Sequence, residues 1–527
     1  MSYLGLILAM VELFDHNEIV RGRYRKVEAL RVGGIEPYAH RYEVMHTSEQ
    51  VVAAFDGGEL GESAEVAVAG RVLAIRRMGK AAFFHLLDSA GKIQIYVRPD
   101  QTDAAGYQLF RGFLDMGDIV GVRGPVFRTK TGEVTILAKR LVLLTKSVRP
   151  LPEKWHGLRD VETRYRQRYA DLIVNESVRR TFLQRSRMIS AMRQFLDAAG
   201  YVEVETPMLQ TIYGGASARP FITHHNTLDV DLYLRIAPEL YHKRLVVGGM
   251  EKVYEINRNF RNEGISTQHN PEFTMLELYT AYWDYRDTMD LAERLIETVF
   301  REVVGSTRVT YQGVEINVER PWRRATILEL IEDKIGRRVN WNDPPAHVAE
   351  SLGISPAEAA GKSSARMIMD VFERRVEESL VGPLIVYDFP AEISPLAKRK
   401  ADEPLVAERF EIFTAGLEIA NAYSELNNPE EQYRRFQEQA ALRAAGDLEA
   451  QVMDEDYVRA LEYGMPPASG LGVGIDRLAM ILTDSPSIRD VILFPTLRPE
   501  VHSPRSGEPA EMNEEERANG GEKTTAE

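Results

Sequence analysis

The stretch that decides the fold runs from Phe260 to Tyr279 and reads FRNEGISTQHNPEFTMLELY. On either side of its centre, polar and apolar residues alternate with a period of two, which is typical of β-strands. The centre is rich in glycine, serine, asparagine and proline, which favour a loop that can wrap a ligand. We therefore predict a β-hairpin with a polar loop, and an ordinary amphipathic hairpin with a solvated face is the alternative.

The alternation assigns the hairpin side chains to two faces, because successive residues of a strand point in opposite directions. On the incoming strand, one face carries Glu255, Asn257, Asn259, Arg261 and Glu263, and the other carries Tyr254, Ile256 and Phe260. On the returning strand, the residues that share a face are Phe273, Met275, Glu277 and Tyr279. An arginine, an aromatic ring, a carboxylate and a phenol are thus predicted to line one cleft.

Three segments carry a resemblance to a known family. The hairpin resembles the second motif of class II aminoacyl-tRNA synthetases, GYVEVETPMLQ at 200–210 resembles the first, and GLGVGIDRLAMIL at 470–482 resembles the third. Two more segments are similar to lysyl-tRNA synthetases of the bacterial type: GGASARPFITHHNTLDVDLYLRIAPELYHKRLVVGG at 214–249 and EIANAYSELN at 418–427. The resemblance runs from about residue 20 to about residue 499.

This resemblance implies an α+β protein. It consists of an N-terminal OB-fold β-barrel and a class II catalytic domain with a central antiparallel β-sheet flanked by helices. We expect a helical extension at 1–57, the anticodon-binding barrel at 58–147, a linker at 148–168, the catalytic domain at 169–499 and a disordered acidic tail at 500–527. A helical insertion is expected at about 310–404, with no assigned chemistry.

Composition sets the outer limits of function. The 527 residues are 44% hydrophobic and can bury a large core in two to four domains. The chain has no cysteine, which excludes disulfides, thiolate nucleophiles and cysteine-bound metal. Its net charge of −14 argues against a general coat of positive charge for nucleic acid, but leaves room for a local basic groove. No apolar run reaches 18 residues, so we expect no membrane span.

The N-terminal region predicts two features. The apolar stretch Leu4–Val11 lacks a preceding basic region and a cleavage site, so we expect a non-secretory extension, with Met10 as an alternative start. A basic helix is expected from His16 to Gly33. Its arginines fit a face that contacts phosphates and equally a solvated face.

Five β-patterned segments between Ala64 and Leu144 predict a small antiparallel barrel of the OB type, which binds single-stranded nucleic acid on one face. The resemblance implies that the barrel holds the tRNA anticodon. The residues expected to contact it are Arg76, Phe83, Gln94 and Glu133. Because Phe83 and Phe84 are adjacent, only one of them can face inward. We expect Phe83 to stack on a base, with a core position as the alternative.

A helix from Val178 to Ala199 repeats apolar residues at helical spacing and stops at Gly200. The resemblance implies that this helix and the strand from Glu203 to Pro207 form the interface of a homodimer. A buried core helix is the alternative.

Activation of an amino acid brings its carboxylate against the α-phosphate of ATP, so positive charge must be concentrated where these two anions meet. Arg261 is suited to bridge them, because a guanidinium donates in two directions and keeps its charge. The resemblance implies catalytic roles for Arg261 and Arg477, with adenine stacked between Phe273 and Arg477. The residues expected to bind ATP are Arg261, Glu263, His269, Asn270, Phe273, Glu411 and Arg477.

Glu411 and Glu418 are the expected metal ligands, on either side of a predicted turn. Pairing of Phe413 with Gly416 would set the two carboxylates opposite one another. Oxygen ligands without histidine favour Mg²⁺, and the resemblance implies several Mg²⁺ ions bound with ATP. A solvated pair of strand glutamates is the alternative.

Strict alternation places Glu418 on one face of its strand and Asn421, Tyr423 and Glu425 on the other. All four are expected at the site, so we predict a β-bulge between Glu418 and Asn421.

The resemblance implies a pocket for L-lysine. The expected lining is Gly215, Glu239, Arg261, Glu277, Tyr279, Asn421, Tyr423 and Glu425. Glu239, in the first turn of a helix opened by Pro238, is expected to pair with the α-ammonium group, although a carboxylate there also complements the helix dipole. Glu425 and Tyr279 would receive the ε-ammonium group. Apolar substrates would leave the carboxylate unpaired and be rejected.

Around EIANAYSEL, the sequence of this chain departs from the glycine-rich motif of the family. Alanine replaces the expected glycine at Ala415, Ala420 and Ala422, Leu417 replaces arginine and Tyr423 replaces phenylalanine. The three added methyl groups are expected to narrow the site or to shift the backbone.

The expected function is that of a cytoplasmic, homodimeric lysine–tRNA ligase. It would convert L-lysine and ATP to lysyl-adenylate and transfer the lysyl group to the 3′ end of tRNA(Lys). The alternatives are a lysylase that modifies an elongation factor, a synthetase for aspartate or asparagine, and a catalytically silent relative that binds RNA through its barrel. The barrel argues against the lysylase, Glu425 against the acidic amino acid and its amide, and the phosphate- and metal-binding residues against the silent relative.

Overall fold

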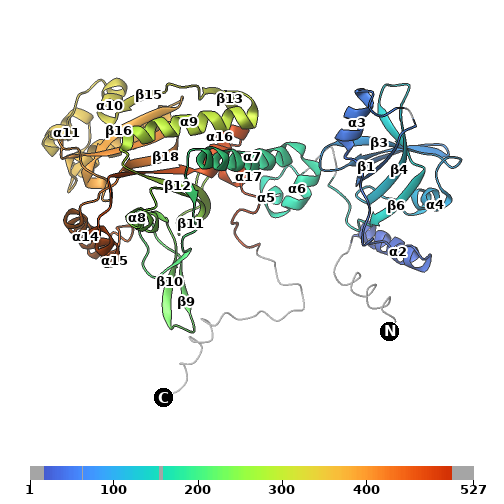
Figure 1. Cartoon of the computed structure of the whole chain (residues 1–527), viewed down its shortest axis with the longest axis horizontal. Coiled ribbons are helices and arrows are strands. Elements are labelled where there is room, and N and C mark those ends of the chain that lie inside the picture. Colours follow the sequence, from blue (N-terminus) through green and yellow to red (C-terminus); the bar gives the residue numbers. More distant parts are fainter. Residues whose placement is uncertain (1–16, 62, 153–157, 501–527) are drawn as a thin grey trace, which may run out of the picture. The chain divides into compact units, whose positions relative to one another are not determined.

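The computed structural model describes residues 17–61, 63–152 and 158–500. The N-terminal stretch Leu4–Val11, the alternative start Met10 and nearly all of the expected tail therefore lie outside the described residues. The chain divides into two compact units between Arg159 and Asp160, and each unit mixes helices and strands (Figure 1). None of the described helices combines the length and apolar character that crossing a bilayer requires.

Within the described residues, the first unit is a closed β-barrel accompanied by three helices. Its strands are β1 (Glu65–Met78), β2 (Ala81–Leu87), β3 (Lys92–Val97), β4 (Ile119–Arg128), β5 (Val134–Leu137) and β6 (Arg140–Thr145). The order is β1-β2-β3-β5-β4-β6, and pairing of β1 with β4 completes the barrel. Its helices are α2 (Glu18–Val32), α3 (Ser48–Asp56) and α4 (Ala104–Gly112).

The segment expected to form the fifth strand of the barrel forms two strands instead. Ala138 and Lys139 separate β5 from β6, because their N–H groups bond to the carbonyl oxygens of Tyr96 and Arg123 on different strands. β5 therefore joins β3 to β4, whereas β6 extends the other side of β4.

The second unit is built on an eight-stranded sheet in the order β15-β16-β17-β18-β19-β12-β11-β7. The strands are β7 (Val202–Glu203), β11 (Lys252–Phe260), β12 (Glu272–Ala281), β15 (Arg323–Thr326), β16 (Leu384–Pro390), β17 (Val406–Thr414), β18 (Leu417–Ser424) and β19 (Ala468–Gly474). The sheet is antiparallel at its centre, as expected, and parallel in the two edge pairs β15–β16 and β11–β7. β8 (Leu209–Gln210), β9 (Ile222–His225) and β10 (Val230–Leu234) form a separate small sheet, and β13 (Arg308–Tyr311) and β14 (Val314–Asn317) form another.

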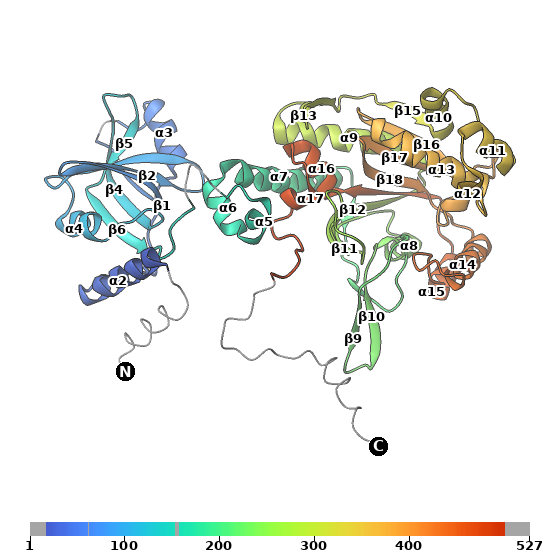
Figure 2. The same ribbon diagram turned by 180° about the vertical axis from the view of Figure 1, so that it is seen from behind.

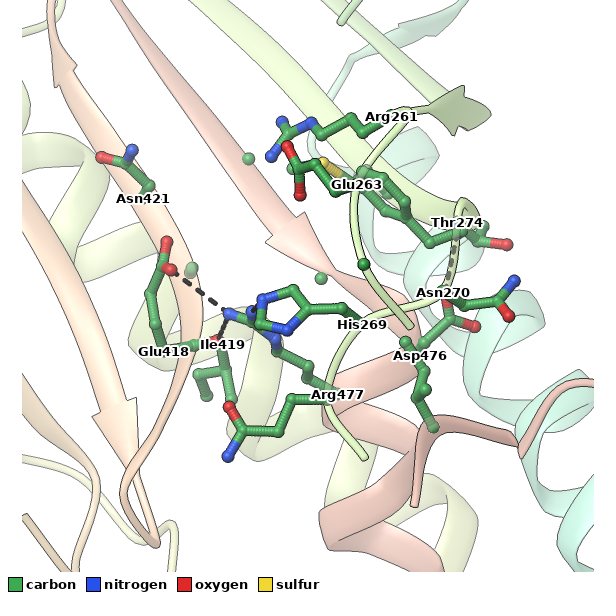
Figure 3. A pocket seen from close by; sticks show the side chains of 18 residues that line it. Arg261, Glu263, His269, Asn270, Thr274, Glu418, Ile419, Asn421, Asp476 and Arg477 are labelled. Carbon is green, nitrogen blue, oxygen red and sulfur yellow. Dashed lines mark hydrogen bonds and ion pairs between the residues drawn. The ribbon is translucent and has the colours of Figure 1, made fainter. Parts of the chain in front are cut away.

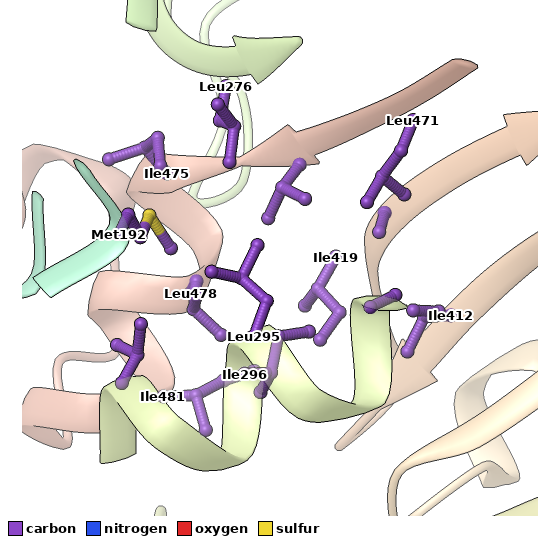
Figure 4. Packing of buried hydrophobic residues seen from close by; sticks show 14 of the residues in the cluster. Met192, Leu276, Leu295, Ile296, Ile412, Ile419, Leu471, Ile475, Leu478 and Ile481 are labelled. Atoms are coloured by element: carbon purple, nitrogen blue, oxygen red, sulfur yellow. The ribbon is translucent and has the colours of Figure 1, made fainter. Parts of the chain in front are cut away.

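Helices cover both faces of the large sheet (Figures 1 and 2). One face packs on α7 (Glu176–Ala198), α9 (Tyr285–Val304) and α16 (Ile475–Thr483) through a large apolar core, part of which is seen in Figure 4. The other face packs at one end on α8 (Glu239–Val247), α14 (Pro429–Ala444) and α15 (Glu455–Glu462). Leu276, Leu278 and Leu471 point into the core with α9, so the residues between them in sequence face the opposite side of the sheet. The unit also contains α5 (Val161–Arg166), α6 (Arg168–Val174) and α17 (Ile488–Val491).

The region at 310–404, expected to be a helical insertion, contains strands as well as helices. It contains α10 (Ile327–Ile335), α11 (Pro345–Leu352), α12 (Pro356–Ala359) and α13 (Ser364–Arg375), close to the expected helices. It also supplies β15 and β16, which extend the central sheet, because their apolar side chains pack against α10 and α13.

The hairpin of β17 and β18 contains the predicted bulge. Phe413 pairs with Glu418, whereas its neighbour Ile412 pairs with Ala420, so Ile419 is the extra residue. The expected pairing of Phe413 with Gly416 is wrong, because the turn lies one residue later: Thr414 pairs with Leu417, and Ala415 and Gly416 are the two central residues. Glu411 consequently lies opposite Asn421 rather than Glu418.

The alanine departures have little direct effect on the site. The side chains of Ala420 and Ala422 lie in the core with α9, as does that of Leu417. The bulge places Ala420 and Ala422 on the core side of β18, so Ala422 does not narrow the site, whereas Ala420 also borders the pocket between β12, β18 and α16. Ala415 instead adopts a left-handed backbone with φ of 53°.

Replacing Ala415 with glycine is expected to raise the free energy of unfolding by about 1 kcal/mol, because glycine adopts this backbone without a clash at Cβ. Urea denaturation measures the change. Gly416→Ala is the matched control and should destabilise, since φ is 71° there and a Cβ would lie 3.2 Å from the Glu378 carbonyl oxygen. Equal stability of Ala415→Gly and the wild type would contradict the argument.

Candidate functional site

Two adjoining cavities lie on the sheet face opposite α9. The first, called the hairpin cavity, has a volume of about 290 Å³ and lies between the loop of β11 and β12, strand β18 and helix α16. The second, called the acidic cavity, has a volume of about 330 Å³ and contains Glu239, Glu277 and Glu425. Residues common to both linings are Arg261, Met275, Glu418, Asn421 and Gly472. Arg261 and Glu425 therefore open onto one continuous hollow.

The register of β11 and β12 explains why the predicted cleft residues meet. Glu255 pairs with Glu277, Asn257 with Met275 and Asn259 with Phe273. Facing residues of paired strands share one side of a sheet, so the predicted assignment of the faces is confirmed. The loop between the strands is tied back on itself, with 2.9 Å between Ser266 Oγ and His269 Nδ1.

Arg477 holds one side of the hairpin cavity (Figure 3). Its Nη1 donates to the carbonyl oxygen of Glu418 at 2.7 Å and to Glu418 Oε2 at 3.2 Å. Its Nη2 lies 3.2 Å from His269 Nε2. Burial and the neighbouring Arg477 lower the pKa of His269, so the ring is neutral and its Nε2 can accept from the guanidinium.

Arg261 holds the other side, at the junction of the two cavities. Its guanidinium carbon lies 5.1 Å from the centroid of the Phe273 ring, a cation–π arrangement. Its Nε is buried and has no hydrogen-bond partner among the described residues, and the same is true of Asn270 Oδ1. Such groups are costly unless a ligand satisfies them.

An ion pair between Arg185 and Asp476, which the sequence did not reveal, borders the hairpin cavity. Asp476 accepts from Arg185 Nη1 at 2.5 Å and from the backbone N–H of Thr274 at 2.7 Å. It thereby ties α7, β12 and α16 together beside Arg477. Asp476 is adjacent to the recognised Arg477, but its partner Arg185 gives no signal, because it belongs to a distant helix.

The acidic cavity gathers the predicted lysine-binding residues. Tyr423 donates its hydroxyl to Glu239 Oε1 at 2.5 Å, and Tyr279 donates to Glu277 Oε2 at 3.4 Å. Lys243, which the sequence did not single out, lies among them. Its Nζ is 2.6 Å from Glu239 Oε1 and 2.5 Å from Glu425 Oε2.

Burial governs the charges in this cavity. It raises the pKa of Glu277 to about 8, with a further contribution from Glu239. It also raises the pKa of Glu425 to about 8, an effect opposed by Lys243 and reinforced by Glu239. For Lys243 burial acts to lower the pKa, but Glu239 and Glu425 outweigh it, so the net shift is upward and the ammonium group stays charged. A substrate cation beside these carboxyl groups would oppose the upward shifts, because a nearby positive charge stabilises the ionised form.

The free energy of unfolding is expected to fall as the pH rises between 4.5 and about 8, the ordinary and the folded-state pKa of Glu277. In this window the folded chain holds a proton that the unfolded chain has lost, so rising pH favours unfolding. Glu277→Gln removes the titration, and its stability relative to the wild type should grow with pH by a few kcal/mol. Urea denaturation without ligand at several pH values measures this difference. Exposed Glu251→Gln is the control, and parallel pH curves for wild type and Glu277→Gln would refute the assignment.

Glycines allow the side chains to approach one another in this cavity. A Cβ on Gly470 would lie 2.5 Å from Glu425 Oε1 and 2.5 Å from a ring atom of Tyr279. A Cβ on Gly215 would lie 2.9 Å from the Cβ of Glu239, and its φ is 87°. Gly215 was predicted at the site, whereas the steric role of Gly470 requires the structure.

Glu411 and Glu418, the predicted metal ligands, both line the acidic cavity. Burial and the nearby Glu418 raise the pKa of Glu411 to about 8, and Arg409 opposes this shift. Arg409 Nη2 donates to Glu411 Oε1 at 2.6 Å. The described residues contain no cluster of three or more metal-ligating side chains, so protein groups alone do not form a closed metal site. Two carboxylates at these adjoining cavities fit Mg²⁺, which commonly completes its shell with water and phosphate oxygens.

The four residues predicted to bind RNA lie close together on the outer face of the barrel. Phe84 is buried in the core, whereas Phe83 faces out and stacks on Tyr96, with 4.5 Å between the ring centroids. Arg76 pairs with Phe83 across the strands, and the Gln94 amide donates to Glu133 at 2.6 Å. Sequence reasoning missed Tyr96 and also His85, whose Nε2 lies 3.0 Å from Glu133.

Comparisons with known proteins agree with these two units. Residues 160–498 match the family model of class II tRNA synthetases (D, K and N), and residues 66–144 match that of the OB-fold nucleic acid binding domain. The chain is 57% identical over 488 residues to the lysine–tRNA ligase of Pelotomaculum thermopropionicum, covering 92% of this chain and 96% of the relative. It is 55% identical to that of Carboxydothermus hydrogenoformans, covering 92% and 98% of the two chains. The chain therefore belongs to the class II tRNA synthetases, in the group of the lysine–tRNA ligases.

Proposed function

We propose that the chain activates L-lysine with ATP to form lysyl-adenylate and transfers the lysyl group to the 3′ end of tRNA(Lys). The observation that carries this proposal is the continuous hollow that joins Arg261 to the buried carboxylates of Glu239, Glu277 and Glu425. A cation at one end suits the reacting anions, and carboxylates at the other suit a substrate with two ammonium groups.

In the first step, the carboxylate oxygen of lysine attacks the α-phosphorus of ATP and pyrophosphate leaves. Arg261 is placed to hold both anions together and to stabilise the charge that develops on the phosphoryl oxygens. Phe273 and Arg477 would stack on the two faces of adenine. Glu263, His269 and Asn270 would hold the nucleotide, since all three line the hairpin cavity.

Glu411 and Glu418 would hold Mg²⁺ together with the triphosphate. When bound, the ion neutralises phosphate charge and orients the pyrophosphate leaving group. Arg409 Nη2 donates to Oε1 of Glu411, so Oε2 is the oxygen that would contact the ion.

Recognition of lysine is assigned to the acidic cavity. Glu239 would bind the α-ammonium group, and Glu425 with Tyr279 would bind the ε-ammonium group. Glu277, Tyr423, Asn421 and Gly215 complete the lining. A neutral or anionic side chain would leave buried carboxylates unpaired, which costs several kcal/mol and explains the selectivity.

In the second step, a ribose hydroxyl at the 3′ end of tRNA attacks the carbonyl carbon of lysyl-adenylate and AMP leaves. We assign the catalytic work to residues 169–499 and anticodon binding to the barrel at 58–147. The stacked Phe83 and Tyr96 present an aromatic surface on which an unpaired base can lie.

Replacing Phe83 with leucine is expected to raise the KM for tRNA by about 10- to 100-fold, because loss of base stacking costs about 1–3 kcal/mol. Aminoacylation kinetics measure the effect, and lysine-dependent pyrophosphate exchange should stay unchanged. Met116→Ala, at an exposed position of the same unit, is the control. An unchanged KM for tRNA would remove Phe83 from the RNA-binding surface.

We also assign a homodimer in the cytoplasm, formed through α7 and β7 as the family resemblance implies. Exposed apolar side chains on and near these elements support an interface there: Leu183, Val202, Met208, Leu209 and Ile212. Light scattering of the wild type and of Leu183→Glu tests this, and a monomeric wild type would contradict it.

Pyrophosphate exchange with each of the twenty amino acids tests the proposed activity. Exchange supported by lysine is the expected result. Exchange only with aspartate or asparagine would assign a different substrate, and no exchange with any amino acid would favour a silent RNA-binding relative. Exchange with lysine but no charging of tRNA would favour another acceptor for the lysyl group.

A further inference from the structure

Lys243 is a fully buried cation in the middle of the acidic cavity's carboxylates. It lies on α8, one turn after Glu239, and its side chain has no solvent exposure. Its ammonium nitrogen is 2.6 Å from Glu239 and 2.5 Å from Glu425, which belongs to a distant part of the chain after β18. It also lies 5.4 Å from the centroid of the Tyr423 ring. One ammonium group therefore bridges the two carboxylates assigned to the two ends of substrate lysine.

The charges around this bridge match those of the proposed substrate. Three buried carboxylates, those of Glu239, Glu277 and Glu425, face the substrate space, and Lys243 neutralises the equivalent of one of them. Arg261, Arg409, Glu411 and Glu418 line the same cavity, and the charges of these two cations and two carboxylates cancel when all are ionised. Two negative charges then remain from the three carboxylates and Lys243, and free lysine carries two ammonium groups. Glu425 Oε1 is buried without a hydrogen-bond partner among the described residues, which leaves it open to the incoming ligand.

Resting on the proposed function, we propose that Lys243 is a positioning residue for lysine recognition. Its ammonium group pairs with both Glu239 and Glu425 and so fixes the two carboxylates relative to one another, as acceptors for the α- and ε-ammonium groups of one lysine. Without it, two carboxylates in a buried space repel one another and each favours its protonated form. A protonated carboxyl group cannot pair with a substrate ammonium until it loses its proton, so affinity would depend strongly on pH.

The ionisable groups that face Lys243 come from several elements. Glu239 lies on α8, Glu425 and Tyr423 on or just after β18, and Tyr457 on α15. Burial keeps the tyrosine pKa values high, so the two phenols stay neutral in the range tested. The carboxylates are thus the groups that respond to loss of the cation.

Lys243→Met tests the proposal, because methionine keeps the length of the side chain and removes its charge. The KM for lysine in pyrophosphate exchange at pH 7 is expected to rise at least about tenfold, with the KM for ATP unchanged within about twofold. The KM for lysine should then fall more steeply with rising pH than in the wild type. Discrimination of lysine from ornithine, which is one methylene shorter, should also weaken.

Lys243→Arg is the matched control, since it retains a cation at this position, and it is expected to keep the pH profile of the wild type. A Lys243→Met enzyme with a wild-type KM and pH profile, or with KM values for lysine and ATP raised equally, would overturn the proposal. If Lys243→Met does not fold, Lys243→Gln replaces it. Should neither fold, a Lys243→Arg enzyme with wild-type lysine KM and pH profile supports the proposal, and one with a raised KM and an unchanged profile, or one that also fails to fold, overturns it.

The wild-type enzyme separates failure of this inference from failure of the proposed function. Absence of lysine-dependent exchange in the wild type would refute the function itself. Normal exchange in the wild type, together with an unaffected Lys243→Met enzyme, would refute only the role of Lys243.

Discussion

Replacing Arg261 with alanine is expected to lower kcat for lysine-dependent pyrophosphate exchange by about 10³-fold. The reaction forces two anions together, and Arg261 is the cation at the junction of the two cavities. Its buried Nε has no partner among the described residues, so the group is available to the reacting oxygens. Because the charge on these oxygens grows in the transition state, the loss should fall on kcat more than on either KM.

Arg258→Ala is the matched control for this prediction. Arg258 lies on β11, the strand that leads to Arg261. Its Nη1 is 3.6 Å from Glu272 Oε1, and both side chains of this ion pair are about half exposed. Exposed pairs contribute little to stability, so this variant should keep nearly full activity. A kcat for Arg261→Ala within about tenfold of the wild type would show that other groups neutralise the reacting anions.

Replacing Glu425 with glutamine is expected to raise the KM for lysine by about 10²- to 10³-fold and to leave the KM for ATP unchanged. The side chain keeps its size, so the change removes charge with little change in packing. Both the substrate ε-ammonium group and the buried ammonium of Lys243 lose a carboxylate partner. The free energy involved is that of an unpaired buried charge, several kcal/mol.

Pyrophosphate exchange at several lysine concentrations measures this effect, and circular dichroism checks that the variant is folded. Glu251→Gln, an exposed glutamate before the same hairpin, serves as the control. A Glu425→Gln enzyme that still prefers lysine with a wild-type KM would place the side-chain pocket elsewhere.

The sequence predicted the local parts of the site well, because their information is local. Alternation of polarity placed Glu255, Glu277 and Met275 on one face, and the register of β11 and β12 confirms it. Strict alternation would put Glu418 and Asn421 on opposite faces, but both were expected at the site. This conflict predicted a bulge, which is found at Ile419. Pro238 was expected to open a helix with Glu239 in its first turn, as α8 does.

Predictions about partners across the sheet were less successful. The turn at Ala415 and Gly416 lies one residue later than expected, and together with the bulge at Ile419 this places Glu411 opposite Asn421. Ala420 and Ala422 were expected to crowd the site, but their side chains lie in the core. Register depends on turn geometry as well as on residue pattern, and a shift by one residue reverses the face.

The sequence by itself determined the family, the two-unit organisation and the chemical types of the reacting groups, because motif spacing and periodicity are properties of neighbouring residues. Only the tertiary structure decided which charges meet. Lys243 reads in the sequence as one more basic residue of a helix, and only folding brings its ammonium nitrogen within 2.5 Å of Glu425, with neither side chain exposed to solvent. Burial then sets their protonation, because the energy of a charge depends on the surroundings that distant segments provide.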